Sequence, residues 1–116
     1  MAQCQAWLME YMKGCGLAVE VWETSGYPTL FGSSMKGGKE VPTLLFYGHY
    51  DVQPPDPLEE WESPPFEPEV RKGNVYARGA IDNKGQGFYT LLAIRAFLLH
   101  AAKENVNINV LIEGEE

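Results

Sequence analysis

Two apolar runs constrain the fold of this 116-residue chain more than any other feature of its sequence. VPTLLFYG (41–48) is apolar on both faces if it is extended, and NINVLIEG (107–114) is a second strand of the buried type. Strands of this kind lie inside a sheet that is covered on both sides. Each run ends in a glycine and is followed by polar residues, so polar side chains are expected where the strands end.

The periodicity of the other segments predicts helices and further strands around these two runs. Residues 3–14 have apolar side chains at helical spacing, and a mostly apolar helix is expected over 84–102. Alternating or β-branched segments predict strands over 17–24, 27–32 and 74–78. Because strands alternate with helices, we expect a layered α/β/α sandwich with a mostly parallel sheet and helices on both sides of it.

Length and charge limit what this chain can bind. A chain of this length forms one domain at most, over residues 1–116. Its net charge is −7 and no basic cluster is present, which argues against nucleic acid and anionic membranes as partners. Cys4 and Cys15 lie about 16 Å apart along the predicted helix, too far for a disulfide. We therefore expect free thiols, no membrane association and a cytoplasmic location.

The segment GHYDVQPP (48–55) places a histidine and an aspartate two residues apart at the end of a predicted strand. In extended backbone, residues two apart point to the same side, so Asp51 can reach the ring of His49. A carboxylate that holds one ring nitrogen leaves the other nitrogen available for a metal. The alternative is a strand-end histidine beside an aspartate that caps the turn, and this spacing alone favours the alternative.

Two further acidic segments also follow predicted strands. Asp82 lies in YARGAIDNKGQG, at a strand-to-helix turn of the kind where ligands bind in α/β sheets. The alternative makes Asp82 the N-cap of the next helix, and this segment alone favours the alternative. Glu115 and Glu116 crowd the end of LIEGEE, where they would repel one another without a cation between them. The alternative there is a solvated acidic terminus.

Taken in order, these segments resemble one family closely. GHYDVQPPDPLEEWESPPFEPEVR, YARGAIDNKGQ and VLIEGEE together resemble the dizinc metallopeptidases that include aminoacylase, carboxypeptidase G and the carnosine-type dipeptidases. The H-Y-D-V-Q-P opening with W-x-S-P-P-F looks most like the dipeptidase branch. The resemblance covers nearly the whole chain from Trp7 onward, and its long middle motif is highly specific.

The resemblance implies a role for each of these residues. His49 would be a ligand of one zinc ion, Asp51 would orient it, and Asp82 would bridge two zinc ions and precede a cis peptide bond to Asn83. Glu116 would be the general base, with a further ligand at position 117. In the other register, Glu115 would be the base and Glu116 a ligand. Manganese or cobalt would suit the same ligands.

The family pattern also implies more than these residues. Its catalytic domain continues past this point to another acidic ligand and a histidine, and it has a second, lid or dimerisation domain. We therefore expect an incomplete part of a hydrolase that cleaves dipeptides or N-acylated amino acids, inactive by itself. Its expected partners are a small substrate and either a second copy or the remainder of the parent chain. The competing hypothesis is a non-catalytic metal-binding or interaction module derived from the family.

Overall fold

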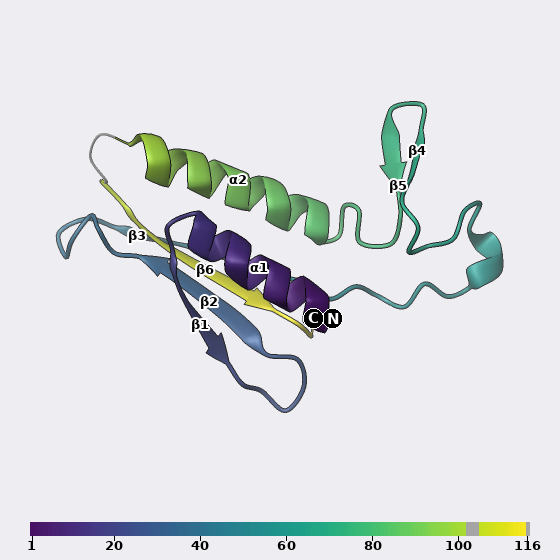
Figure 1. Ribbon diagram of the computed structural model, residues 1–116, viewed down its shortest axis with the longest axis horizontal. Coiled ribbons are helices and arrows are strands. Elements are labelled where there is room, and N and C mark those ends of the chain that lie inside the picture. The colour runs from purple at the N-terminus through teal and green to yellow at the C-terminus, as the bar shows by residue number, and fades with distance from the viewer. Residues whose placement is uncertain (102–104, 116) are drawn as a thin grey trace.

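The computed structural model describes residues 1–101 and 105–115, which form one four-stranded sheet, two long helices and a separate small hairpin (Figure 1). The elements are α1 (Ala2–Gly14), β1 (Ala18–Trp22), β2 (Thr29–Ser34), β3 (Thr43–His49), the 3₁₀ turn η1 (Leu58–Glu60), β4 (Glu69–Arg71), β5 (Asn74–Tyr76), α2 (Lys84–His100) and β6 (Asn107–Glu113). The predicted strands and helices are all present, with bounds shifted by at most two residues. No helix in the described part is long and apolar enough to cross a membrane.

The sheet is mixed, which corrects the expectation that it is mostly parallel. Its strand order is β1-β2-β6-β3, and only the β3–β6 pair is parallel. β1 and β2 are joined by a short connection, which returns the chain antiparallel to itself. β3 and β6 are parallel because α2 lies between them in the sequence and carries the chain back to the same end of the sheet. The mixed α/β class itself is confirmed.

Both helices lie on the same face of the sheet, where the expectation was one on each side (Figure 1). The core on that face includes Met12 of α1, Leu91 of α2 and Val110 of β6. The ring of Phe88 in α2 contacts the ring of Trp7 in α1, so the two helices also pack against each other. Apolar residues on both faces of a strand indicate burial, but they do not say which segment covers which face.

The opposite face of the sheet has no helix over it in the described residues. Leu45 and Tyr47 of β3 point to that face and are 61% and 63% exposed. The small hairpin of β4 and β5 projects away from the sheet (Figure 1) and exposes Val70 and Val75. The molecule measures 54 × 38 × 20 Å, which is flat for a chain of this length.

Candidate metal centre

The candidate site lies where β3 and β6 end together. The two parallel strands are in register up to His49, which pairs with Glu113. One residue further, the backbone N–H of Tyr50 donates to the carbonyl oxygen of Glu113 at 2.8 Å. The chain is therefore still bonded to the sheet one residue past the end of β3, and His49 is only 7% exposed.

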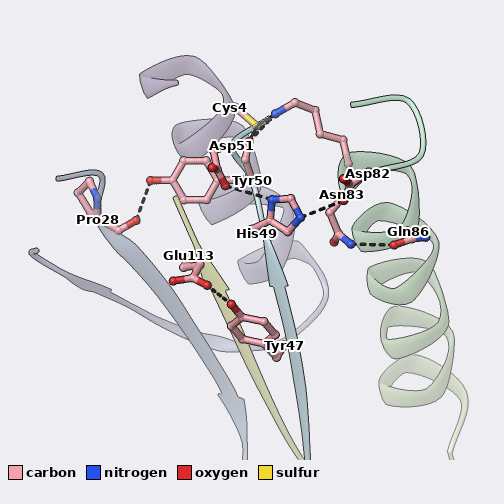
Figure 2. Close-up of polar contacts among 11 residues, drawn as sticks. Cys4, Pro28, Tyr47, His49, Tyr50, Asp51, Asp82, Asn83, Gln86 and Glu113 are labelled. Atoms are coloured by element: carbon pink, nitrogen blue, oxygen red, sulfur yellow. Dashed lines mark hydrogen bonds and ion pairs between the residues drawn. The ribbon is translucent and has the colours of Figure 1, made fainter. Parts of the chain in front are cut away.

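The ring of His49 lies between two carboxylates (Figure 2). Its Nδ1 is 3.1 Å from Oδ1 of Asp51, and its Nε2 is 3.1 Å from Oδ1 of Asp82. A neutral imidazole has one N–H, so it can donate to only one of these two carboxylates. If that proton is on Nδ1, facing Asp51, the lone pair of Nε2 points at Asp82. The predicted contact between Asp51 and His49 is thus present, and Asp82 joins them.

Asp82 reaches this site from the connection between β5 and α2. Its side chain is 62% exposed, and the peptide bond from Asp82 to Asn83 is cis, as the resemblance implied. The N-cap residue of α2 is Asn83, so the alternative role of Asp82 as the cap is wrong. The Nδ2 of Asn83 donates to Oε1 of Gln86 at 2.7 Å within the first turn of α2.

β3 and the Asp82–Asn83 segment approach each other closely at Gly48. A Cβ added at Gly48 would lie 3.0 Å from Oδ1 of Asn83. Such a distance is tighter than an ordinary van der Waals contact, so a side chain at position 48 would push the two segments apart. The glycine at the end of the apolar run therefore lets Asp82 reach His49.

The pair of His49 and Asp82 fits a shared zinc ion. Nitrogen and oxygen ligands lie about 2.0–2.2 Å from zinc, so two ligands of one tetrahedral ion are about 3.3 Å apart. The observed separation of Nε2 and Oδ1 is 3.1 Å. Within residues 1–101 and 105–115, however, no group of three or more His, Cys, Asp and Glu side chains is arranged so that it could hold a metal ion. These two residues fit part of a zinc site and do not complete one.

The acidic residues of the last segment separate from one another. The carboxylate of Glu113 accepts a hydrogen bond from the hydroxyl of Tyr47 (Figure 2). The carboxylate of Glu115 occupies the space that a Cβ at Gly26 would take, in the connection between β1 and β2. Glu116 lies outside the described residues. The assignment of the base to Glu116 or Glu115 therefore stays a prediction.

Tyr50, which the sequence-based reasoning did not select, is the residue that holds this site to the core. It lies between His49 and Asp51, so alternation along the extended backbone turns its side chain away from them, and it is 1% exposed. Its hydroxyl donates to the carbonyl oxygen of Pro28 at 2.7 Å (Figure 2). Burial raises the pKa of Tyr50, and negative charge nearby, including that of Asp51, raises it further.

Lys84 was also missed. Its Nζ donates to the carbonyl oxygen of Tyr50 at 2.5 Å and lies 3.4 Å from Sγ of Cys4. The sequence did contain a signal for the burial of Tyr50, because the alternation that places His49 and Asp51 on one side of the backbone places Tyr50 on the other. The contact of Lys84 joins residues 34 apart, and nothing local in the sequence indicates it.

The sequence of this chain is similar to those of known proteins. Residues 45–116 match the family described as Peptidase family M20/M25/M40. The succinyl-diaminopimelate desuccinylase of Methylococcus capsulatus is 42% identical over 82 residues, which are 71% of this chain and 22% of that protein. The protein of the same name from Nitrosospira multiformis is 36% identical over 113 residues, which are 97% of this chain and 29% of that protein.

Two solved structures superpose on nearly the whole chain. An M20 family metallo-carboxypeptidase from Sulfolobus solfataricus matches with a TM-score of 0.82 and 38% identity, over 96% of this chain and 25% of its own. Human carnosine dipeptidase 1 matches with a TM-score of 0.79 and 29% identity, over 95% of this chain and 25% of its own. This chain thus spans between about a fifth and a third of the length of such relatives. Because the match to the family covers more than half of this chain, the chain belongs to peptidase family M20/M25/M40.

Proposed function

We propose that this chain carries part of the active site of a zinc-dependent hydrolase that cleaves an amide bond. The observation that supports this most directly is the ring of His49 held at 3.1 Å from both Asp51 and Asp82. Nε2 of His49 and the carboxylate of Asp82 would hold metal, and Asp51 would fix the ring of His49 in the tautomer that binds it.

The residues of this chain would then have separate tasks. When bound, zinc would polarise the scissile carbonyl and lower the pKa of the attacking water. Glu116, assigned from the sequence motif alone, would take the proton of that water and return it to the leaving amine. His49 and Asp51 are nearly enclosed while the side chain of Asp82 is exposed, so a substrate would approach from the side of Asp82.

The proposed substrates are dipeptides or N-acylated amino acids. The relatives support both classes by name, since they include a carnosine dipeptidase, a metallo-carboxypeptidase and succinyl-diaminopimelate desuccinylases. These names share the hydrolysis of an amide bond. We propose that residues of the parent protein outside this chain complete the substrate-binding site and determine which substrate it accepts.

The proposal is tested on the protein as its gene encodes it, by measuring bound zinc and hydrolysis of a dipeptide and an N-acylated amino acid. His49→Gln should lower the zinc content, whereas His100→Gln, which changes the other histidine, on the exposed end of α2, should leave it unchanged. Equal zinc contents in the two variants would refute the assignment of His49.

The role of the base is tested separately from metal binding. Glu116→Gln should keep zinc bound and lower turnover by about 10²- to 10⁴-fold, because proton transfer by a positioned group contributes on that order. Turnover retained in Glu116→Gln but lost in Glu115→Gln would move the base to Glu115. An encoded protein that binds zinc and hydrolyses neither substrate would favour the non-catalytic module.

A further inference from the structure

Lys84 connects the two segments that carry the proposed zinc ligands. It is the first residue of α2 and follows Asp82 by two positions. Its Nζ donates at 2.5 Å to the carbonyl oxygen of Tyr50, the residue between His49 and Asp51. One side chain from the Asp82 segment therefore holds the backbone of the His49 segment at its centre.

The surroundings of the ammonium group favour a fixed position for it. The contact with the carbonyl is partly buried, and a hydrogen bond from a charged donor is stronger than a neutral one. The ammonium also lies 3.4 Å from Sγ of Cys4 in α1. The side-chain stem passes Gly79, where its Cδ and Cε lie 3.5 Å from the position of an added Cβ. The ammonium group is therefore placed between α1 and the segment that follows β3.

We propose that Lys84 is a positioning residue that sets the separation of His49 Nε2 and Asp82 Oδ1. This inference rests on the proposed function, because the separation matters only if a metal ion bridges these two atoms. Lys84 itself touches neither ligand atom in the described contacts. It acts through the carbonyl of Tyr50, whose neighbours on both sides, His49 and Asp51, point toward the site.

The test compares zinc affinity, measured by competition with a chromophoric chelator, in variants of the encoded protein. Lys84→Met keeps the length of the stem and a similar helix propensity but removes the ammonium group. We expect zinc to bind about 10- to 100-fold more weakly, the range typical for loss of a group that orients a metal ligand. Lys13→Met is the matched control. In the described contacts Lys13 pairs only with Glu10, on the surface of α1, so the zinc affinity of this variant should not change.

Rescue and spectroscopy separate positioning from a general loss of stability. Lys84→Arg, which retains a charged donor, should recover most of the affinity. With cobalt in place of zinc, Lys84→Met should alter the d–d absorption bands that report ligand geometry. Ile94→Val removes one methyl group from the buried core on α2 and should lower stability without altering the bands. Lys84→Gln gives the same comparison if Lys84→Met does not fold.

The outcomes distinguish this inference from the function on which it rests. Tight zinc binding by the unchanged protein, with the same affinity and bands in Lys84→Met, would overturn the role of Lys84 and leave the proposed function standing. A protein that binds no zinc in any variant would overturn both. Equal band changes in Lys84→Met and Ile94→Val would show that Lys84 contributes stability only.

Discussion

Replacing Tyr50 by phenylalanine tests whether the buried residue between His49 and Asp51 holds this end of the sheet. The change removes only the hydroxyl, which donates to the carbonyl oxygen of Pro28 at 2.7 Å, and leaves a ring of nearly the same volume. Tyr50 is 1% exposed, so water cannot take the place of the lost hydroxyl. The carbonyl of Pro28, the residue before β2, is left without this donor.

We expect Tyr50→Phe to lower the free energy of unfolding by about 1–2 kcal/mol, which is typical when one partner of a buried hydrogen bond is removed. Tyr47→Phe is the matched control: Tyr47 is three positions earlier on β3, its hydroxyl donates to Glu113, and it is 63% exposed. Its loss should cost less than about 0.5 kcal/mol, because water can take the place of an exposed partner.

The assay is urea unfolding of the encoded protein, followed by tryptophan fluorescence and far-ultraviolet circular dichroism. Tyr50→Phe should lower the midpoint without changing the dependence of the free energy on urea, since neither folded nor unfolded state changes in exposed area. If Tyr50→Phe and Tyr47→Phe shift the midpoint equally, the hydrogen bond to Pro28 does not stabilise this end of the sheet. The account of Tyr50 given above would then be wrong.

Two substitutions, a pH dependence and a labelling pattern test the site and the core. Gly48→Ala should weaken zinc binding, because its Cβ would lie 3.0 Å from Oδ1 of Asn83; Gly14→Ala, with nothing within 4 Å of the added atom, is the control, and equal affinities would contradict the close approach. Asp51→Asn should lower zinc affinity about 10- to 100-fold in the same chelator competition, and unchanged affinity would show that the ring of His49 does not need it. Burial raises the pKa of Cys15 above its ordinary 9.0, with Arg95 opposing, so the stability that this buried thiol contributes should be complete below pH 9.0 and fall as the pH rises beyond it. Iodoacetamide should accordingly label the part-exposed Cys4 before Cys15 in the folded protein, as peptide mass spectrometry would show, and equal labelling would contradict the burial of Cys15.

The parts of the fold that could be predicted from the sequence are those fixed by local periodicity. The strand expected over 41–48 is β3, and its end at His49 follows from the glycine and polar residues after the apolar run. The contact of Asp51 with His49 follows from alternation in extended backbone, which needs no knowledge of the rest of the molecule. The cis bond after Asp82 came from the resemblance alone.

The parts that could not be predicted depend on contacts between distant segments. The sequence of β2 does not reveal that it pairs antiparallel with β6, because its alternation fits either direction. The apolar face of β3 that carries Leu45 and Tyr47 reads as buried, although both helices cover the other face of the sheet. Lys84 has an ordinary place near the start of a helix, and its partner at Tyr50 is visible only once the chain is folded.

Tyr50 connects the candidate site to the mixed sheet. The N–H of Tyr50 donates a hydrogen bond to the carbonyl oxygen of Glu113 in β6, and its hydroxyl donates to the carbonyl oxygen of Pro28 beside β2. Its own carbonyl oxygen accepts a hydrogen bond from Lys84 of α2. Because a side chain in extended backbone points opposite to those of its neighbours, burying Tyr50 turns His49 and Asp51 toward the site. The buried contacts of Tyr50 therefore determine the direction in which these two polar side chains point. A local opening that released His49 would have to break hydrogen bonds to three other segments, so the His49 end of β3 should open about as rarely as the core itself.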